Sequence, residues 1–366
     1  MSRSQLALLL CVVLIFSMGL LMVFNTTAAE VLDRSLDRST HHALFRQILY
    51  AVFGVGIASG FWFLGYQNVI KLSGPLLIFG SFLLLLVFIP KVGQELNGAR
   101  RWIGFFGLSF QPSEFVKYLI PLYYIQVMTT REGPFQLRGF LKLLGLLAIP
   151  MGLILIEPDN GTTAIILVSL VGLFVLTRLR WVFWALPLAV FMAVGGLVAM
   201  QMPHVSDRIQ IYLHPELDLQ GKGHQPYQAK IAAGSGKLWG KGLAESLQKM
   251  DYLPEARSDY IAAIYAEEFG FIGMMVLIGL YMVFGFLGFY LASQAKDQEG
   301  FYLVAIFTFL ICFQAFLNLG VVSGLLPSKG TNLPFFSQGG SSLIANCMAV
   351  SLMLNVGRKT CQSPVS

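Results

Sequence analysis

The sequence has little charge and contains long runs without any. Of its 366 residues, 12% are Asp, Glu, Lys or Arg and 56% are hydrophobic, whereas a soluble domain usually carries about 25% charged residues. Because a soluble protein of this length needs a more polar surface, the deficit argues against a soluble fold. In a bilayer, apolar side chains face lipid, so the composition predicts a membrane protein.

The motifs of metal, nucleotide and nucleic-acid chemistry are also absent from the sequence. Four cysteines and five histidines are scattered without a CxxC or Cys/His spacing, and no Walker A, GxGxxG or HExxH motif occurs. Disulfide frameworks, zinc hydrolysis and ATP-driven work are therefore unsupported. The net charge of +6 forms no basic stripe with interleaved aromatic residues, so we expect no nucleic-acid partner.

Ten apolar runs approach the length of about 20 residues that a membrane-spanning helix needs. None shows the apolar–polar alternation of a barrel strand. They predict an all-α polytopic membrane protein with about ten transmembrane helices, forming a single domain over residues 1–366. The runs are 5–25, 47–66, 72–90, 113–129, 140–156, 162–178, 181–201, 261–293, 301–325 and 341–357.

An even number of spans places both termini on one side of the membrane, and the distribution of Lys and Arg beside the spans favours the cytoplasm. Residues 202–260 form the one long segment between spans and are expected to be a large extracytoplasmic loop. Apolar residues such as Trp239 and Leu243 are too frequent there for a disordered linker. We therefore expect short amphipathic helices at the membrane surface.

Some charged residues fall within or close to the predicted spans, where one charge costs at least ~2.5 kcal/mol at mid-bilayer. Glu114 and Lys117 are three residues apart, so they either pair on one helix face or line a functional path. Glu268, with its neighbour Glu267, either supports the long loop or takes part in chemistry.

Asp259 lies where the long loop meets a span, in the stretch Arg-Ser-Asp-Tyr. A carboxylate at a partly dry interface can have a raised pKa and act as a general base, although Arg257 would oppose that rise. The alternative role is a helix N-cap, since Ser258 and Asp259 directly precede an apolar helix. The residues alone leave both roles open.

Several basic residues on the same predicted face could bind a pyrophosphate, because Arg offers paired donors and Lys a point charge. Contact with lipid headgroups is the alternative. Ser341 and Ser342 open the last span, where backbone N–H groups can hold an anion or simply form a small-residue turn. The basic residues are Arg100, Arg101, Lys249, Arg257 and Lys329.

Several stretches in these polar segments resemble the SEDS family, the shape, elongation, division and sporulation proteins typified by RodA and FtsW. They occur in the family's order between residues 97 and 343, so the resemblance covers nearly the whole chain. The stretches are Gly-Ala-Arg-Arg-Trp-Ile with Gln-Pro-Ser-Glu-Phe-Val-Lys, Glu-Pro-Asp-Asn-Gly-Thr, Gly-Lys-Gly-Leu-Ala-Glu-Ser-Leu-Gln-Lys-Met-Asp-Tyr-Leu-Pro-Glu-Ala, Glu-Glu-Phe-Gly-Phe-Ile-Gly and Pro-Phe-Phe-Ser-Gln-Gly-Gly-Ser-Ser-Leu.

The resemblance implies a peptidoglycan glycosyltransferase of the bacterial inner membrane that polymerises lipid II into β-1,4-linked glycan strands at the outer face. The family's essential aspartate falls on Asp259, which would act as general base, with undecaprenyl diphosphate as the leaving group. The basic residues and the two serines would bind the pyrophosphate. Supporting roles are expected for Glu114, Lys117, Asp159, Glu255, Arg257 and Glu268.

The implied partners are lipid II, a class B penicillin-binding protein with transpeptidase activity, and other divisome proteins. No cofactor is certain; a divalent cation, Mg²⁺ or Mn²⁺, could assist, but the sequence shows no ligands for it. The stretch Leu-Pro-Ser-Lys-Gly at 326–330 matches the division-type branch, FtsW, and so points to the division septum. Three departures stand out: Arg257 replaces the family's usual His, Glu157 its Gln and Gln338 its Tyr.

Two other functions stay open from the sequence. A lipid II flippase would use polar groups near mid-membrane, such as Glu114 and Lys117, as a translocation path. A scaffold would only position and activate the transpeptidase, without chemistry of its own.

Overall fold

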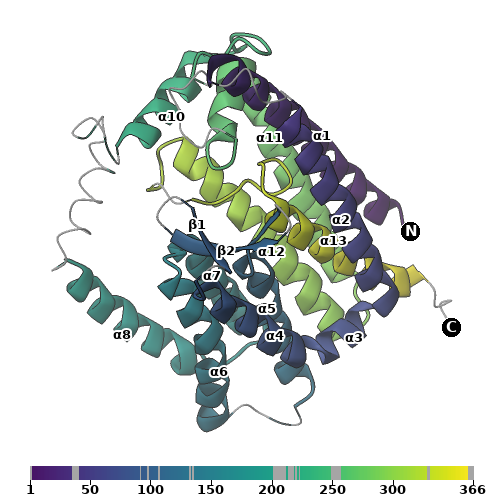
Figure 1. Ribbon diagram of the computed structural model, residues 1–366. Coiled ribbons are helices and arrows are strands. Elements are labelled where there is room, and N and C mark those ends of the chain that lie inside the picture. The colour runs from purple at the N-terminus through teal and green to yellow at the C-terminus, as the bar shows by residue number, and fades with distance from the viewer. Residues whose placement is uncertain are drawn as a thin grey trace.

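Ten long helices form the body of the computed structural model, and each overlaps one of the ten apolar runs (Figure 1). They are α1 (Arg3–Arg34), α2 (His42–Leu64), α4 (Ser73–Val87), α5 (Ser113–Thr129), α6 (Leu137–Ile156), α7 (Asn160–Leu176), α8 (Trp181–Met200), α11 (Ile261–Ser293), α12 (Gln298–Val322) and α13 (Gly340–Cys361). The structure describes residues 2–34, 41–90, 92–96, 99–105, 108–131, 133, 136–200, 212, 218, 221, 223–248, 257–327 and 330–361.

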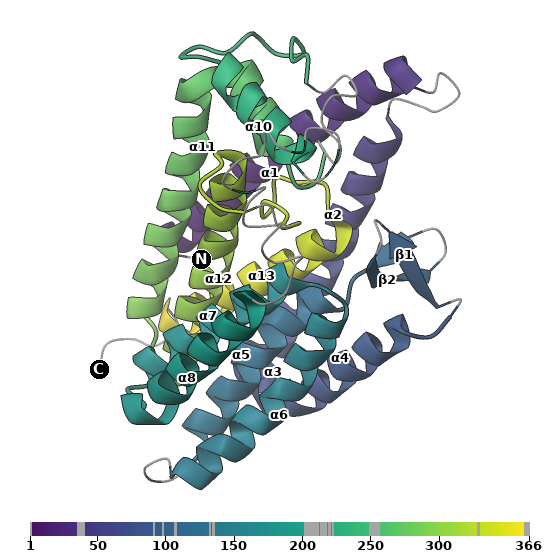
Figure 2. The same ribbon diagram turned by 90° about the vertical axis from the view of Figure 1, so that its left-hand side faces the viewer.

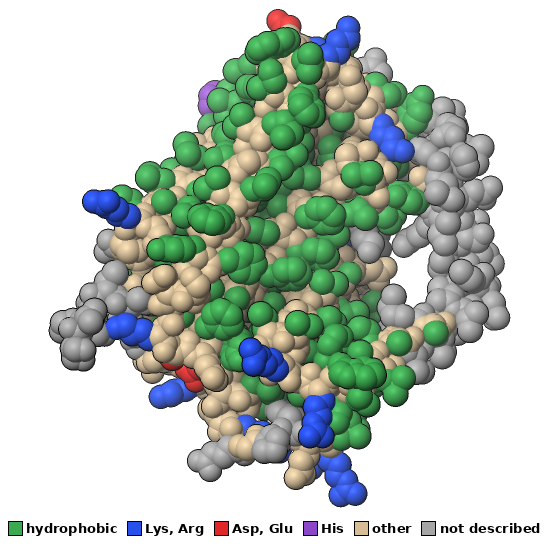
Figure 3. Space-filling model, turned by 180° about the vertical axis from the view of Figure 1, so that it is seen from behind, with side chains coloured by type: hydrophobic (Ala, Val, Ile, Leu, Met, Phe, Trp, Pro, Cys, Tyr) green, Lys and Arg blue, Asp and Glu red, His purple; other side chains and the backbone are tan. Residues whose placement is uncertain are grey.

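The helices satisfy their own backbone hydrogen bonds, as an apolar solvent requires. Within the described ranges, α1, α2, α6, α11, α12 and α13 are each long and apolar enough to cross a membrane, and α4 and α7 are shorter apolar helices. The back of the molecule presents mostly hydrophobic side chains with few charges (Figure 3). The prediction of a polytopic helical membrane protein is therefore confirmed.

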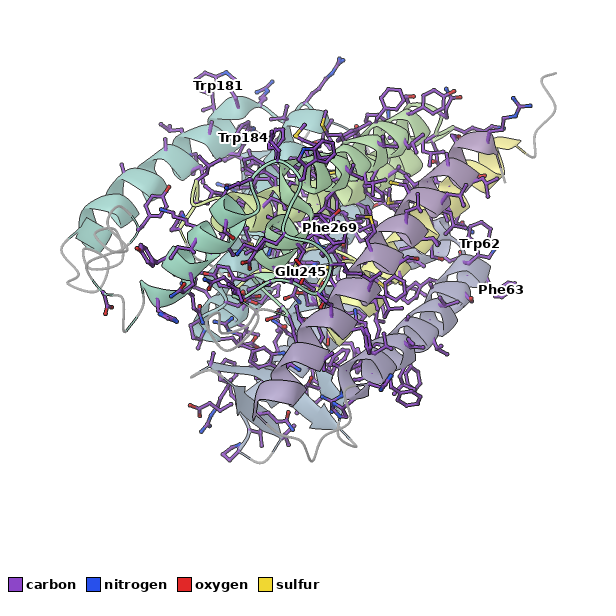
Figure 4. The ribbon with its side chains drawn as sticks, turned by 90° about the horizontal axis from the view of Figure 1, so that it is seen from above. Trp62, Phe63, Trp181, Trp184, Glu245 and Phe269 are labelled. Atoms are coloured by element: carbon purple, nitrogen blue, oxygen red, sulfur yellow. The ribbon has the colours of Figure 1, made fainter. Side chains whose placement is uncertain are left out.

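Both termini lie at the same end of the bundle (Figure 1). The side-chain amide of Gln5 in α1 donates a hydrogen bond to the carbonyl of Leu354 in α13 at 2.6 Å. Trp62 and Phe63 close α2 and Trp181 opens α8, and these aromatic side chains lie at the outer edges of the bundle (Figure 4). Aromatic residues at helix ends are typical of the boundary between lipid and water.

A small antiparallel sheet lies at the opposite end of the bundle, between α4 and α5 (Figure 2). Its strands β1 (Gly93–Leu96), β2 (Ala99–Phe105) and β3 (Leu108–Phe110) are ordered β1-β2-β3, with Gly93 opposite Ile103 and Phe105 opposite Leu108. The sequence pattern predicts helices alone. The sheet escapes that pattern because its strands are short and lie in a polar stretch between two long apolar runs.

In the described part of segment 202–260, residues His224–Ser235 form helix α10, which packs its buried Ala229 and Ala232 towards the bundle. It lies across the same end as the sheet (Figure 2). A short surface helix was expected in this segment. That 202–260 as a whole is one loop outside the membrane stays a prediction.

Helix α11 is broken at Gly270, whose backbone (φ 65°, ψ −163°) is not helical. The loop 237–242 inserts at this break and pairs with the main-chain groups that the break frees, so that α11 and the loop stabilise each other. Glu245 in the continuation of this loop and Phe269 beside the break are labelled in Figure 4. The pairs are Lys241 N–H to Glu267 O (3.0 Å), Gly242 N–H to Glu268 O (3.1 Å), Phe271 N–H to Lys237 O (2.8 Å) and Ile272 N–H to Leu238 O (3.2 Å).

Glycine is required where the two backbones meet, and this generates a testable prediction. Gly240 has φ +80°, and a Cβ there would collide with the backbone of Glu268. We expect Gly240→Ala to lower the free energy of unfolding by about 1–3 kcal/mol, measured as a lower melting temperature in detergent. Gly279→Ala is the matched control, because Gly279 lies in α11 and a Cβ there meets nothing within 4 Å. Equal melting temperatures for both variants would contradict the account.

Candidate functional site

Four polar segments that are far apart in the sequence meet at the end of the bundle away from the termini. Their described parts are residues 111–117, 157–163, 257–260 and 330–342. The main-chain N–H of Gln338, just before α13, donates to the carbonyl of Arg257 at 3.0 Å. The main-chain N–H of Gln111, just before α5, donates to the Ser341 hydroxyl at 2.8 Å. These two contacts bring residues of three of the segments together, and their position at the outer face of the membrane stays a prediction.

Asp259 lies in the turn that leads into α11. Its side chain is half-buried, and the N-cap position is occupied by Tyr260 rather than by Asp259. The carboxylate lies close to the backbone of Gly330, since a Cβ placed there would be 3.1 Å from Oδ2. The main-chain carbonyl of Asp259 accepts a hydrogen bond from the Asn318 side chain at 2.8 Å. The carboxylate therefore sits where the turn meets the loop between α12 and α13.

Asp159 joins two of the polar segments through hydrogen bonds. Its Oδ1 accepts from the Thr162 N–H at 3.1 Å and so caps α7. Its Oδ2 accepts from the Gln111 amide at 3.2 Å and from the Ser113 hydroxyl at 3.3 Å. Because both oxygens are engaged, Asp159 acts here as a structural anchor of the site.

Arg100 and Arg101 point to different surroundings, because consecutive residues in a strand face opposite sides of the sheet. Arg100 pairs with Glu95 within the hairpin, with Nε 3.1 Å from the carboxylate and both side chains exposed. Arg101 instead donates to the main-chain carbonyls of Glu157 (2.9 Å) and Pro158 (2.7 Å). The structure thus brings Arg101, but not its neighbour, onto the turn between α6 and α7.

The carboxyl group of Glu157 is buried, and neither oxygen has a hydrogen-bond partner in the described part of the chain. Burial and the nearby Asp159 carboxylate raise the pKa of Glu157 to about 8, against the lowering effect of Arg101. Glu157 is therefore mostly protonated at neutral pH. As a consequence, the carboxyl group of Glu157 does not cancel the positive charge of Arg101.

Glu114 and Lys117 form a buried ion pair within α5. Lys117 Nζ lies 2.5 Å from Glu114 Oε2 and also donates to the Gln314 side-chain oxygen at 2.7 Å. The prediction that the two residues pair on one helix face is confirmed. Because the two charges are satisfied by each other and by an amide, the pair gives no support to a translocation path.

Glu267 and Glu268 support the loop that inserts into the break of α11. Glu267 accepts from the Lys241 ammonium and the Ser246 hydroxyl, both at 2.5 Å. Glu268 accepts from the Asn25 amide at 2.5 Å and the Ser246 N–H at 3.4 Å. These contacts favour the first of the two roles considered for Glu267 and Glu268, which is to support the long loop.

The remaining predicted site residues divide into two groups. Lys249, Glu255 and Lys329 lie outside the described residues. Ser341 holds the Gln111 backbone, whereas the Ser342 hydroxyl is buried with no hydrogen-bond partner among the residues that the structure describes. Anion binding at this helix start stays a prediction.

Sequence reasoning missed Gln314 and Asn318, two amides four residues apart in α12. Asn318 contacts the backbone of Asp259, and Gln314 contacts Lys117. The available signal was the presence of two polar side chains, one turn apart, in an otherwise apolar span, where polar groups are costly unless they have partners.

A helical bundle with polar segments gathered at one end defines a polytopic membrane protein with an interfacial site. The family model for cell cycle proteins of the FtsW, RodA and SpoVE type matches residues 5–362, and the chain belongs to this family. Together with its apolar helices, this membership makes it a multi-pass inner-membrane protein.

Curated relatives and solved structures resemble nearly the whole chain. The probable peptidoglycan glycosyltransferase FtsW of Coxiella burnetii is 34% identical, over 96% of each chain. The stage V sporulation protein E of Bacillus subtilis is 37% identical, over 98% of each. A chain from a structure titled as the coordination of polymerization and crosslinking by a peptidoglycan synthase complex has a TM-score of 0.77 and 29% identity, covering 97% of this chain and 98% of its own. RodA of Thermus thermophilus has a TM-score of 0.69 and 27% identity, covering 97% of each chain.

The protonated state of Glu157 leads to a prediction about stability and pH. Its pKa is raised from 4.5 to about 8 in the folded protein, so between these values the unfolded chain loses the proton while the folded protein keeps it. The free energy of unfolding should therefore fall as pH rises from about 4.5 to 8, by on the order of 5 kcal/mol at about 1.4 kcal/mol per pKa unit. Above pH 8 the loss should level off.

Melting temperatures of wild type and Glu157→Gln between pH 4.5 and 8.5 provide the measurement. The glutamine variant should show a flatter profile and a higher melting temperature at pH 8. Glu95→Gln, which changes the exposed carboxylate of the hairpin, should follow the wild-type profile. Parallel profiles for wild type and Glu157→Gln would show that Glu157 does not hold its proton.

Proposed function

We propose that this chain is a peptidoglycan glycosyltransferase that polymerises lipid II into β-1,4-linked glycan strands at the outer face of the inner membrane. The observation that carries the proposal is the half-buried Asp259 carboxylate, seated beside Gly330 where the polar segments converge. The names of the FtsW relatives support the reaction class. The stretch Leu-Pro-Ser-Lys-Gly at 326–330 resembles the division-type branch of the family, which supports a role at the division septum.

Asp259 acts as the general base in this proposal. Its carboxylate removes the proton from the 4-hydroxyl of the acceptor N-acetylglucosamine, and that oxygen attacks the anomeric carbon of the donor N-acetylmuramic acid. The bond to undecaprenyl diphosphate breaks as the new bond forms, which inverts the configuration and yields the β-1,4 link. Both substrates are lipid-anchored in one plane, so part of their orientational entropy is lost before the reaction.

Arg101 stabilises the departing diphosphate. It uses two of its five N–H donors on the carbonyls of Glu157 and Pro158, which hold the guanidinium in place, and its other donors have no hydrogen-bond partner among the residues that the structure describes, so they can bind an anion. Because Glu157 is protonated near neutral pH, the charge of Arg101 is available to the phosphate oxygens. Ser342 and the undescribed Lys249 and Lys329 are further candidates for this contact.

No step of this mechanism is routed through a metal. The described residues contain no group of three His, Cys, Asp or Glu side chains that could hold an ion, and both oxygens of Asp159 are taken by hydrogen bonds within the protein.

We further propose that both termini lie in the cytoplasm, which places Asp259 at the outer face, where lipid II is used. The 202–260 segment is then extracytoplasmic. The synthase complex among the structural relatives couples polymerization with crosslinking, which supports a class B penicillin-binding protein as partner, with other divisome proteins beyond it.

The general-base role predicts that Asp259→Asn abolishes polymerisation. We expect a loss of at least about 100-fold in the rate of glycan formation from labelled lipid II by the purified protein with its partner, because the amide cannot accept the proton. Asp297→Asn is the matched control, since Asp297 caps α12 at the end of the bundle that carries the termini. Normal glycan polymer from the Asp259 variant would remove the assignment.

The two adjacent arginines allow a paired test of leaving-group stabilisation. Arg101→Ala should lower the polymerisation rate by about 10- to 100-fold, since a charge-assisted contact to the diphosphate is lost. Arg100→Ala, which removes only the exposed pair with Glu95, should stay within about 3-fold of wild type. Equal losses for the two variants would count against a specific role of Arg101.

A further inference from the structure

Asn318 of α12 connects the proposed catalytic turn to the loop that faces it. Its side-chain nitrogen donates to the carbonyl of Asp259 at 2.8 Å and to the carbonyl of Thr331 at 2.7 Å. Asn318 and Thr331 are both buried. One amide group therefore holds together the two backbone segments between which the Asp259 carboxylate lies.

These two carbonyls also determine which way the Asn318 amide faces. If the side chain were flipped, its oxygen would meet two acceptor oxygens and no donor, which is unfavourable in a buried site. The nitrogen must therefore face the two carbonyls. The amide holds the segments through the only donor group of its side chain.

Gln314 lies one helical turn earlier on α12 and holds the next residue of the same loop. Its nitrogen donates to the Asn332 carbonyl at 2.9 Å, and its oxygen accepts from Lys117 at 2.7 Å. Lys117 is in turn paired with Glu114. The buried ion pair of α5 thus fixes the orientation of Gln314, and Gln314 fixes the loop.

We propose that Gln314 and Asn318, here named the amide clamp, are positioning residues for glycan polymerisation, acting by holding the Asp259 turn against the 330–332 loop. This inference rests on the proposed role of Asp259. Neither side chain is expected to contact the reacting atoms. The clamp sets where the carboxylate stands relative to the sugar hydroxyl, and displacement of a reacting group by about 1 Å can cost 100-fold in rate.

The clamp has a matched control in the same bundle. Asn355 of α13 is also a buried asparagine that joins separate elements, accepting from the Tyr66 N–H at 3.1 Å and donating to the Trp62 carbonyl at 2.9 Å. It lies at the end of the bundle that carries the termini, away from Asp259. Replacement of either asparagine by leucine removes a buried amide of similar size, so the cost to folding should be similar.

The experiment measures kcat and KM for lipid II polymerisation by the complex with its partner, together with the melting temperature of each variant. Asn318→Leu should lower kcat by about 100-fold with KM within about 2-fold of wild type. Asn355→Leu should lower the melting temperature comparably but leave kcat nearly unchanged. Asn318→Gln keeps the donor group on a longer side chain and should recover at least about 10-fold of the lost kcat.

Gln314→Leu extends the test to a residue that does not touch Asp259, and it decides the matter if Asn318→Leu does not fold. It should lower kcat by about 10-fold without changing KM, because only the loop side of the clamp is released. The inference would be overturned if Asn318→Leu and Asn355→Leu lost kcat equally, in proportion to their melting temperatures. It would also be overturned if Gln314→Leu kept the wild-type kcat. Activity in Asp259→Asn would instead overturn the proposed function, so the two failures are distinguishable.

Discussion

Irregular backbone at the edge of a bilayer has to find its hydrogen-bond partners inside the protein, because lipid offers none. The site is built from such backbone, and in each case a polar side chain or a broken helix supplies the partner. Arg101 holds the turn after α6, and Asn318 holds the turn before α11. The break at Gly270 receives the loop 237–242. Polar residues in the sheet and in the helices therefore fix the shape of the site.

The loop between α12 and α13 also finds hydrogen-bond partners within the protein, and it does so inside the bundle. Gln314 lies eight residues before the end of α12, or about 12 Å along the helix at 1.5 Å per residue, yet it contacts the backbone of Asn332. The loop therefore dips into the bundle. Its Leu333, Phe335 and Phe336 are buried there, so irregular chain at this depth is shielded by protein rather than exposed to lipid.

The helices could be predicted from the sequence because each is a local property of one apolar run. The polar motifs are also local in the sequence, and the four polar segments that contain them meet in the structure. Which side chains meet depends on geometry that no motif contains. Strand alternation separates Arg100 from Arg101, and the roles of Asn318 and Gln314 depend on a loop that follows them in the chain. The motifs thus predicted which segments come together, but not which of their side chains contact one another.

Arg257 stands where the family usually has histidine, and the hydrogen bonding of the backbone explains how the site accommodates this change. The contact described for this residue is made by its main-chain carbonyl, which accepts from the Gln338 N–H at 3.0 Å. A main-chain contact does not depend on the side chain, so the join between the Asp259 turn and the start of α13 survives the change. Glu157 is also an ionisable residue in place of the family's usual neutral one. Because it keeps its proton near neutral pH, it does not cancel the positive charge that Arg257 adds, and such a charge suits the diphosphate leaving group of the proposed reaction.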